Sequence, residues 1–261
     1  MDMQNGVAIV TGSSSGVGAA CARQLAELGA HVVINYSRNE EGAKATEAAC
    51  QEFGAETLVV KADVSDDAQC RALAQAAEDR WGRIDTLVNN AGTTKFVPHT
   101  DLEGLSSDDF LRVYAVNTLG PFMMSRAVVP AMQRGKRGSI VNVSSIAGVM
   151  GVGSSIAYAA SKGALNTMTL SLARALGPYI RVNTICPGFI QGDWLRGGLG
   201  DAAYEASKRR VEETSPLNVA STPDDIAAGV LYFIVGADVV TGETLIMDGG
   251  SHLATAGLTK R

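Results

Sequence analysis

The amino-acid sequence predicts an α/β fold, a Rossmann-type doubly wound sheet of seven parallel strands with helices on both faces. Short apolar runs alternate with longer segments of helical pattern along the chain. These runs are continuously apolar, which is typical of parallel strands covered on both sides. The first run leads through a glycine-rich turn into a helical segment, the order in which such sheets begin.

Each predicted strand is a short run rich in Val, Ile or Thr. The seven runs are Val7–Thr11, His31–Tyr36, Thr57–Lys61, Thr86–Asn89, Ser139–Ser144, Arg181–Ile185 and Thr244–Met247. The helical patterns between them are Gly16–Leu28, Glu40–Phe53, Asp67–Trp81, Asp108–Arg134, Ser155–Leu176 and Pro223–Val235. They follow no fixed period, so the pattern argues against a solenoid.

Length and composition favour one domain spanning residues 1–261. A chain of 261 residues with 46% hydrophobic residues can bury one large core. Its 29 glycines and seven prolines are spread out, without the cluster that marks a linker. The net charge is −5, and the basic clusters Arg134–Arg137 and Lys208–Arg210 are short, so we expect no nucleic-acid partner.

The spacing of the cysteines and the sequence of the N-terminus indicate in which cellular compartment the protein is expected. Cys21, Cys50, Cys70 and Cys186 are widely separated, and the three histidines are isolated. We therefore expect free buried thiols, with neither a disulfide framework nor a metal site. The N-terminus carries no signal-peptide pattern, and no run approaches the length of a membrane span. A cytoplasmic protein without membrane contact is the expectation.

The glycine turn reads Thr11-Gly12-Ser13-Ser14-Ser15-Gly16-Val17-Gly18. Glycines allow close approach of the backbone to a ligand, and the following helix presents unpaired N–H groups at its N-terminus. Together they predict a binding site for a pyrophosphate. The spacing Thr-Gly-x-x-x-Gly-x-Gly differs from the general G-x-G-x-x-G pattern and is more specific than it.

Tyr158 and Lys162 stand four residues apart in a helical pattern, with Ser145 thirteen residues before the tyrosine. An i, i+4 pair shares one helix face, so an ammonium can lie beside a phenol and lower its pKa towards the range useful for proton transfer. The alternative for the pair alone is an ordinary surface contact.

Several further motifs stand where predicted strands end. They are Asp63-Val64, Asn89-Asn90-Ala91-Gly92, Ser145 and Pro187-Gly188, joined by Asn117 in a helix. Ligands of doubly wound sheets bind outside the carboxyl ends of the strands. Singly, each motif has a simpler explanation: Asn-Asn-Ala-Gly can merely turn the chain, and Asp63 can cap the next helix. Their coincidence favours one shared site.

With the glycine turn and Tyr158-x-x-x-Lys162, these motifs resemble the short-chain dehydrogenase/reductase superfamily in its compact single-domain branch. The resemblance extends from Gly6 to Gly250, and the nearest likeness is to 3-oxoacyl-(acyl carrier protein) reductase-like and ketoreductase members. It implies an NAD(P)-dependent oxidoreductase that interconverts a ketone and a secondary alcohol, reversibly, by hydride transfer.

The resemblance also implies catalytic roles. Tyr158 would be the general acid for reduction, and Lys162 would bind the nicotinamide ribose while lowering the tyrosine pKa. Ser145 would hydrogen-bond the substrate oxygen. Asn117 would shape its helix and hold a water that links Lys162 to solvent. Ser144 is the rival for the serine role, but the thirteen-residue spacing in the family selects Ser145.

By the same resemblance, Asp63 and Val64 would hold adenine, and Asn90 to Gly92 would line its ribose. The full expected cofactor set is Gly12, Ser14, Ser15, Gly16, Val17, Gly18, Tyr36, Ser37, Arg38, Asp63, Val64, Asn90, Ala91, Gly92, Tyr158, Lys162, Pro187, Gly188 and Ile190. One position departs from the family pattern: Gly192 replaces the usual threonine that holds the nicotinamide amide.

The end of the second strand bears on the choice of cofactor. An NAD enzyme places Asp or Glu there, whereas this chain has Asn35-Tyr36-Ser37-Arg38. Arg38 can clamp a 2′-phosphate with help from Ser37, or it can be an ordinary exposed charge. NADP(H) is the expected cofactor, and NAD remains an alternative.

The expected substrate pocket is mainly apolar, which favours a neutral ketone over a phosphorylated sugar. Its candidate walls are Thr94, Phe96, Val97, Ala147, Val149, Met150, Phe189, Trp194 and Leu199. Residues 189–215 read as a glycine-hinged lid or, alternatively, a plain surface loop. Arg196 on this segment is a possible anchor for a charged substrate.

Two other functions stay open: an NAD-dependent polyol, sugar or hydroxysteroid dehydrogenase, and a dinucleotide-binding sensor without turnover. The resemblance further implies a homotetramer. The apolar stripe Leu165, Met168, Leu172 and Leu176 would contribute to it if the sheet leaves the stripe uncovered; otherwise the stripe is internal core.

Overall fold

The computed structural model describes residues 1–254. Seven strands form one parallel sheet in the order β3-β2-β1-β4-β5-β6-β7. They are β1 (Val7–Val10), β2 (His31–Tyr36), β3 (Thr57–Lys61), β4 (Thr86–Asn89), β5 (Gly138–Val143), β6 (Ile180–Pro187) and β7 (Thr244–Met247). The predicted fold class is confirmed, and each predicted strand is present with its ends shifted by at most two residues.

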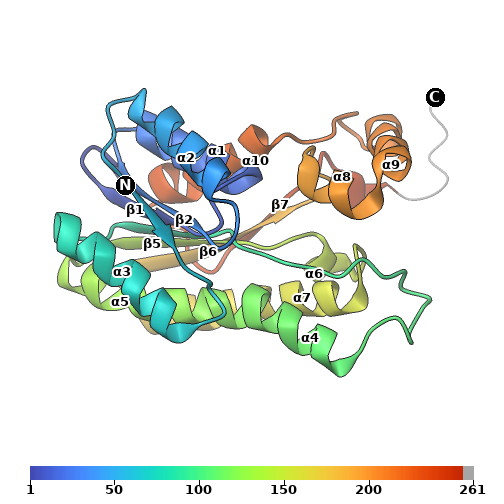
Figure 1. Cartoon of the computed structure of the whole chain (residues 1–261), viewed down its shortest axis with the longest axis horizontal. Coiled ribbons are helices and arrows are strands. Elements are labelled where there is room, and N and C mark those ends of the chain that lie inside the picture. Colours follow the sequence, from blue (N-terminus) through green and yellow to red (C-terminus); the bar gives the residue numbers. More distant parts are fainter. Residues whose placement is uncertain (255–261) are drawn as a thin grey trace.

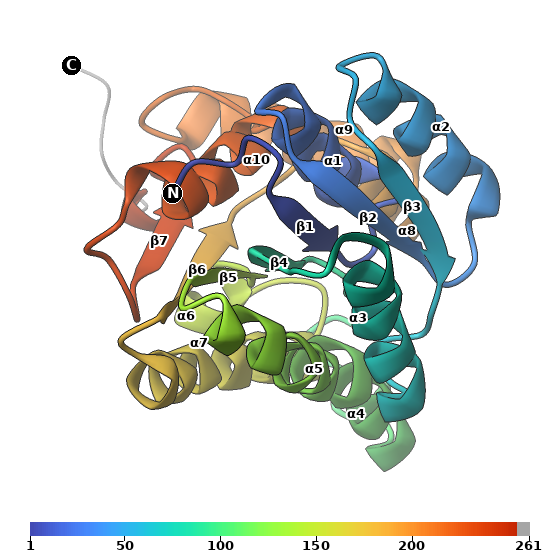
Figure 2. The same cartoon turned by 90° about the vertical axis from the view of Figure 1, so that its left-hand side faces the viewer.

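Helices cover both faces of the sheet (Figures 1 and 2). One face carries α1 (Gly16–Glu27), α2 (Glu40–Gln51) and α10 (Pro223–Leu231). The other carries α3 (Asp67–Trp81), α4 (Ser107–Tyr114), α5 (Gly120–Arg134) and α7 (Ile156–Leu176). Each layer has its own apolar core: Leu25 and Phe233 lie in the first, and Leu73 and Met124 lie in the second. Burial of these side chains is the main force that holds the layers to the sheet.

The strand order reverses direction between β1 and β4, which pair as neighbours although β2 and β3 intervene in sequence. At such a switch point the loops after the two strands diverge and leave a crevice outside the carboxyl ends. The loop that carries the glycine turn and the loop that carries Asn90 lie at this point, in direct contact with one another.

The predicted helix Asp108–Arg134 is interrupted. α4 passes into a wide π-helical turn, η1 (Ala115–Leu119), in which Gly120 donates to the carbonyl of Ala115 five residues earlier. α5 follows at once. The cause is Pro121, which has no N–H to donate to the carbonyl of Asn117 and so interrupts the α-helical ladder. Asn117 consequently lies inside the wide turn.

Within residues 1–254, three α-helices were not predicted, α6 (Ala147–Met150), α8 (Asp193–Leu199) and α9 (Asp201–Thr214), nor was the short 3-10 helix η3 (Ser251–Leu253). α8 contains two glycines, and α9 is mostly polar with only Tyr204 buried, so neither shows a strong apolar period. In Figure 1, α8 and α9 lie together beyond the carboxyl ends of the strands. The segment predicted as a lid or loop is thus a helical pair.

The apolar stripe of α7 lies partly in the core. Leu165 is 1% exposed, and Leu172 and Leu176 pack against the second core cluster. Strand β6 and helix α4 are among the elements that pack against α7. Leu165 is therefore internal core, whereas Met168, Leu172 and Leu176 are half-buried, so the elements of this chain cover the stripe only in part.

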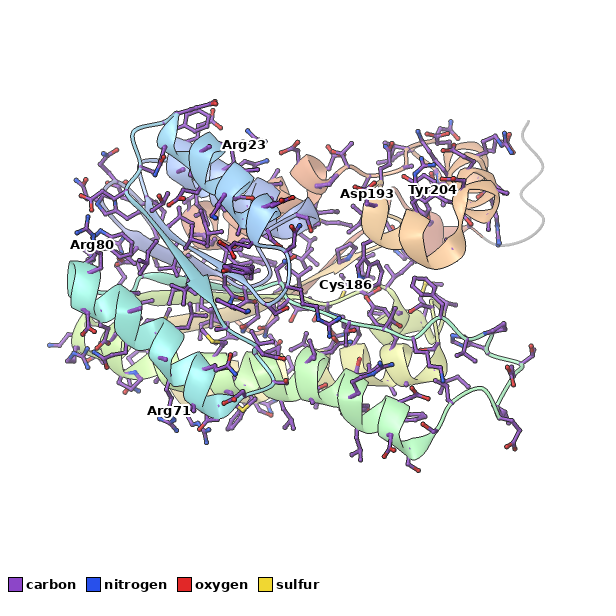
Figure 3. The ribbon with its side chains drawn as sticks, in the orientation of Figure 1. Arg23, Arg71, Arg80, Cys186, Asp193 and Tyr204 are labelled. Carbon is purple, nitrogen blue, oxygen red and sulfur yellow. The ribbon has the colours of Figure 1, made fainter. Side chains whose placement is uncertain are left out.

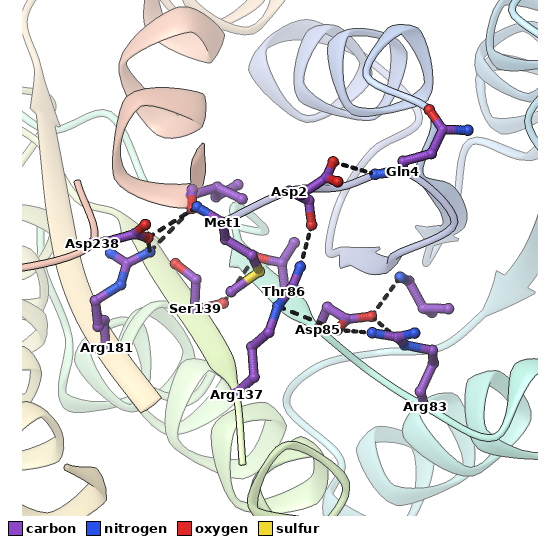
Figure 4. A network of polar contacts seen from close by, with 12 residues as sticks. Met1, Asp2, Gln4, Arg83, Asp85, Thr86, Arg137, Ser139, Arg181 and Asp238 are labelled. Atoms are coloured by element: carbon purple, nitrogen blue, oxygen red, sulfur yellow. Dashed lines mark hydrogen bonds and ion pairs between the residues drawn. The ribbon is translucent and has the colours of Figure 1, made fainter. Parts of the chain in front are cut away.

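The opposite end of the sheet holds a polar network that ties the N-terminus to β4 (Figure 4). Asp85, just before β4, accepts from the Val7 N–H at 2.9 Å and from Arg83 at 2.7 and 2.8 Å. The Met1 ammonium pairs with Asp238 at 2.9 Å. This end lies away from the crevice, which indicates a structural role.

Two further observations complete the fold. All four cysteines are free and buried, as the sequence predicts. Within residues 1–254, no helix is long and apolar enough to cross a membrane.

Candidate active site

The glycine turn is shaped by close backbone approaches. Gly12 has φ +61°, and its N–H donates to the Asn35 side-chain oxygen at 3.0 Å. A Cβ added at Gly12 would lie 2.9 Å from Cα of Ala91. At Gly18 it would lie 2.5 Å from the Gly12 carbonyl oxygen, closer than real Cβ contacts come. Both positions therefore require glycine.

Asn90, in the loop after β4, holds the glycine turn by direct hydrogen bonds. Its side-chain Nδ2 donates to the carbonyls of Thr11 and Gly12 at 2.9 and 3.0 Å. The Thr11 hydroxyl accepts in return from the backbone N–H groups of Asn90 and Ala91. Sequence reasoning assigned Asn90 to a ribose, but its amide donors are engaged by the turn, so its side chain positions the loop.

The start of α1 is suited to an anion. Ser15 occupies the N-cap without a side-chain hydrogen bond to the helix, and the first turn contains no acidic residue. The partial positive charge of the helix N-terminus is therefore not neutralised by α1 itself. Of the predicted phosphate-binding residues here, Ser15 and Gly16 are exposed, Ser14 is half-buried and Val17 is buried.

At the end of β2, Ser37 and Arg38 are exposed, while Tyr36 is buried. Within residues 1–254 Arg38 has no ion pair, whereas the nearby Glu40 is bound to Lys44 at 2.7 Å. Burial, and then the Glu40 carboxylate, raise the pKa of Tyr36. The Arg38 guanidinium is thus available to a ligand beside the glycine turn.

Asp63 and Val64 follow β3. One Asp63 oxygen accepts from the N–H and hydroxyl of Ser65, at 2.9 and 2.7 Å. Asp66, not Asp63, caps α3, so the capping explanation for Asp63 is wrong. Val64 is 5% exposed, and its side chain packs where a Cβ on Gly120 would lie.

Tyr158 and Lys162 occupy one face of α7. Ser155 is the N-cap of this helix, and its hydroxyl accepts from the Tyr158 N–H at 3.2 Å. The Lys162 Nζ lies 5.7 Å from the centre of the Tyr158 ring and donates to the Val143 carbonyl at 2.8 Å. Lys162 thereby spans from α7 to the end of β5. The predicted shared face is present, at the carboxyl edge of the sheet.

The pKa values of this pair differ from expectation. Burial raises the pKa of Tyr158 to about 12, and the neighbouring Ser145 side chain offsets only part of that increase. Burial also lowers the pKa of Lys162 to about 8. In the chain alone, burial therefore dominates both pKa shifts, because removal from water disfavours the charged form of each group.

The two candidate serines point to different partners. Ser145 lies at the start of α6, where its hydroxyl accepts from the Ala147 N–H at 3.1 Å. Ser144 is 4% exposed and donates to the Lys162 carbonyl at 3.2 Å. The structure thus places Ser145 beside the tyrosine and engages Ser144 with the helix backbone.

Asn117, in the wide turn, is completely buried. Its Oδ1 accepts from the Thr93 N–H at 2.8 Å, and its Nδ2 donates to the Thr93 carbonyl at 2.9 Å and to the Ser161 hydroxyl at 3.0 Å. The side chain therefore fastens the loop after β4 to α7. The predicted shaping role fits these contacts, while both amide donors are used by protein groups instead of a water.

The strand-six side of the site departs from the family pattern as the sequence indicates. Gly188 donates to the Met247 carbonyl at 3.0 Å, and Ile190 bridges to Ser221. Pro187 accepts from the Ile146 N–H at 2.9 Å. Gly192 has φ +147°, and its N–H donates to the Tyr204 hydroxyl at 3.1 Å. Without a side chain and with its N–H engaged, Gly192 offers no anchor to a ligand.

The predicted pocket walls divide into two groups. Phe96, Trp194, Val149, Met150 and Leu199 are wholly or partly exposed, whereas Val97 and Ala147 are buried at 6% and 2%. Thr94 shares a hydrogen bond with Ser154 at 2.7 Å. Phe189 packs on Tyr204 of α9, with ring centres 5.4 Å apart. Val97, Ala147 and Phe189 therefore support the site from behind.

Arg196 is engaged within the helical pair. It forms ion pairs with Asp201 at 2.9 Å and Glu205 at 2.7 Å, and its guanidinium lies 4.1 Å from the centre of the Tyr204 ring. Figure 3 shows Tyr204 in α9 and Asp193 at the start of α8. Both lie toward the end of the molecule at which β6 ends with Cys186 and Pro187. Arg196 therefore joins α8 to α9.

Asn35 was missed by sequence reasoning. Besides accepting from Gly12, its side chain donates to the Ala62 carbonyl at 3.0 Å. Asn35 is 1% exposed, so it joins β1, β2 and β3 beneath the crevice. The sequence did contain a signal for this role, because Asn35 stands inside an otherwise apolar strand, where a buried amide needs hydrogen-bond partners.

A glycine-rich turn at the edge of a doubly wound sheet, with a tyrosine, a lysine and a serine at the same edge, is typical of dinucleotide-dependent oxidoreductases. Residues 11–252 match a family model described as enoyl-(acyl carrier protein) reductase. A Streptomyces violaceoruber protein named "Granaticin polyketide synthase putative ketoacyl reductase 2" is 40% identical over 247 residues, covering 95% of this chain and 96% of the relative.

Two further matches extend the comparison. The L-rhamnose 1-dehydrogenase (NAD(P)(+)) of Azotobacter vinelandii is 35% identical over 248 residues, covering 93% of this chain and 94% of the relative. The crystal structure of levodione reductase superposes with a TM-score of 0.90 at 31% identity, covering 97% of this chain and 100% of that one. The chain belongs to the short-chain dehydrogenase/reductase family, an oxidoreductase family that binds NAD(P).

Proposed function

We propose that this protein is an NADPH-dependent carbonyl reductase that converts a neutral ketone into a secondary alcohol, reversibly. The observation that carries the proposal is the position of Tyr158, beside Lys162 and Ser145 and across the crevice from the glycine turn. The relative named as a ketoacyl reductase supports the same reaction class.

The residues present fit a dinucleotide. Gly12 and Gly18 leave the backbone bare where a Cβ would collide, and the start of α1 carries an unneutralised positive end. In the proposal these groups would hold the pyrophosphate, Asp63 and Val64 would hold adenine, and Lys162 would hold the nicotinamide ribose. When bound, the cofactor supplies the hydride for the carbonyl carbon.

Tyr158 donates a proton to the carbonyl oxygen in this mechanism. With a pKa of about 12 the phenol is protonated at neutral pH, which suits an acid that works in the direction of reduction. Lys162, with a pKa of about 8, is still mainly protonated there and stabilises the phenolate that forms. The Ser145 hydroxyl donates to the same substrate oxygen.

The preference for NADPH rests on Arg38. It is exposed, without an ion pair in the described chain, at the strand end where an NAD enzyme places a carboxylate. Its fork of donors matches a 2′-phosphate.

The preference for a neutral substrate rests on the cations near the crevice. Lys95 is paired with Asp109 at 2.7 Å and also donates to the Gly104 carbonyl at 2.9 Å. Arg196 is paired twice within the helical pair. Neither is free to bind a carboxylate or phosphate, whereas the exposed walls are aromatic or aliphatic.

A sugar or polyol dehydrogenase is the second candidate, because the L-rhamnose 1-dehydrogenase is 35% identical. Steady-state assays of ketones and alcohols, with each cofactor in turn, separate the two candidates. We expect faster turnover of neutral ketones with NADPH than of any sugar or polyol with NAD. The opposite order would favour the dehydrogenase.

The test of the site is Tyr158→Phe. We expect turnover to fall by about 10²–10⁴, the usual contribution of general acid catalysis, while NADPH binding measured by fluorescence is retained. Activity within about tenfold of wild type would remove Tyr158 from the mechanism. Loss of both activity and binding would instead indicate a damaged fold.

We further propose that the chain acts as one domain, as a homotetramer and in the cytoplasm. Exposed Leu111, Leu119 and Phe122 on α4, η1 and α5 support self-association, and four free buried thiols suit a reducing compartment. Light scattering at micromolar concentration should return about four times the chain mass of 27.1 kDa. A mass near that of one chain would refute the tetramer.

A further inference from the structure

Three aromatic rings from separate parts of the chain meet at the crevice. The centre of the Trp194 ring, in α8, lies 5.8 Å from that of Phe96 and 6.1 Å from that of Tyr158. Both pairs are tilted, by 53° and 44°, in the range of favourable aromatic contacts. Trp194 is nevertheless 51% exposed, so part of the indole remains uncovered beside the proposed acid.

Gly198 determines how α8 meets Phe96. A Cβ added at Gly198 would lie 2.0 and 2.1 Å from two carbons of the Phe96 ring, so the ring lies directly against the helix backbone. The adjacent Gly197 has nothing within 4 Å of the same added atom. Of the two adjacent glycines, Gly198 therefore provides the surface of α8 on which the Phe96 ring lies.

The other side of α8 is joined to α9. Arg196 pairs with Glu205 at 2.7 Å, and the Gly192 N–H donates to Tyr204 at 3.1 Å. Tyr204 is 3% exposed and so anchors the pair. With Phe96 on one side and α9 on the other, the position of Trp194 relative to Tyr158 is defined.

We propose that Trp194 is a specificity-determining residue, seated by Phe96, whose uncovered indole packs against a planar apolar group next to the substrate carbonyl. The inference rests on the proposed carbonyl reduction and narrows its substrate class to neutral ketones with an aryl or flat cyclic substituent. A carbonyl that accepts from the Tyr158 hydroxyl has its substituents within reach of the neighbouring indole. A rigid flat ring matches a flat ring better than a flexible chain does.

The first test compares a matched pair of ketones, benzylacetone and 2-decanone, with NADPH. Trp194→Leu keeps an apolar side chain but removes the flat face. We expect it to lower the ratio of kcat/KM values, aryl over chain, by about three- to tenfold. Trp194→Phe should preserve most of the ratio. An unchanged ratio in Trp194→Leu overturns the inference.

The second test uses the two adjacent glycines. Gly198→Ala must displace the Phe96 ring or α8, whereas Gly197→Ala makes the same chemical change in open space. We expect Gly198→Ala to lower the aryl preference by at least about threefold and Gly197→Ala to leave it at the wild-type value. Equal effects of the two substitutions contradict the seating role of Phe96.

The third test measures binding without turnover. The chain has two tryptophans, and Trp81 lies on α3, stacked on His31 at 5.6 Å and bonded to Glu56. Trp81→Phe therefore leaves Trp194 as the only indole fluorophore. We expect benzylacetone to quench it saturably, in contrast to 2-decanone.

The binding test also separates the two proposals. Saturable quenching without reduction of any ketone would support the aromatic site and refute the proposed reaction. Reduction of ketones without quenching by the aryl ligand would refute the role of Trp194 and leave the reaction standing.

Discussion

Asn35 is the residue whose replacement should weaken fold stability and cofactor binding together, because its side chain contacts both the glycine turn and the end of β3. Its side chain is the acceptor for the Gly12 N–H at 3.0 Å and a donor to the Ala62 carbonyl at 3.0 Å, at 1% exposure. Asn35→Ala removes this partner from the buried Ala62 carbonyl and from the half-buried Gly12 N–H. Each such loss costs about 1–3 kcal/mol, so we expect the free energy of unfolding to fall by roughly 2–6 kcal/mol.

The same substitution frees the glycine turn, because the Gly12 N–H loses the contact that directs it. We therefore expect the Kd for NADPH to rise at least about tenfold. Urea denaturation gives the stability, and fluorescence titration gives the Kd.

Asn183 supplies a matched control. It is also buried in a strand, where it donates to the Val240 carbonyl and accepts from the Glu243 N–H, both at 3.0 Å, but it lies in β6. Asn183→Ala should cost similar stability with unchanged NADPH affinity. If Asn35→Ala changes the Kd no more than Asn183→Ala does, the link between Asn35 and the glycine turn is refuted.

Three further predictions address other parts of the molecule. Arg38→Asp should reverse the preference for NADPH over NADH, measured as a kcat/KM ratio, and an unmoved ratio would show that the 2′-phosphate is recognised elsewhere. Lys162 has a folded pKa of about 8, below its ordinary value, so the unfolded chain binds more protons above that pH and stability should rise with pH there. Lys162→Met should lack this rise in urea denaturation, and identical pH dependence in the two proteins would contradict the burial of the ammonium. Asp85→Asn should lower the free energy of unfolding by about 2–4 kcal/mol, because it weakens a buried partner of Arg83 and of the Val7 N–H. We expect kcat to be unchanged. A fall in kcat would show that this end of the sheet is coupled to the crevice.

The sequence predicts the sheet well because its strands are buried on both faces and read as continuous apolar runs. It predicts Ser145 at the end of a strand, and Tyr158 and Lys162 on one face of a helix because they are four residues apart. Helices α8 and α9 escaped prediction because their order comes from the pairing of Arg196 with Glu205 and from one buried tyrosine, not from an apolar stripe.

Other contacts depend on tertiary structure and leave no local pattern. Sequence spacing places an ammonium near a phenol, but the direction of the Tyr158 pKa shift depends on how much water the surrounding elements exclude. The engagement of the Asn90 donors by Thr11 and Gly12 likewise requires β1 and β4 to be neighbours.

The wide turn at Asn117 has a consequence for anyone who transplants or redesigns this site. The residue that interrupts the helix is Pro121, one helical turn downstream, while Asn117 only occupies the place that the interruption creates. A designer who copies the polar side chains into another scaffold with Ala at that downstream position would obtain a regular helix, with the amide rotated away from Thr93 and Ser161. The unit to transfer is therefore the whole segment from residue 115 to residue 121, including Pro121.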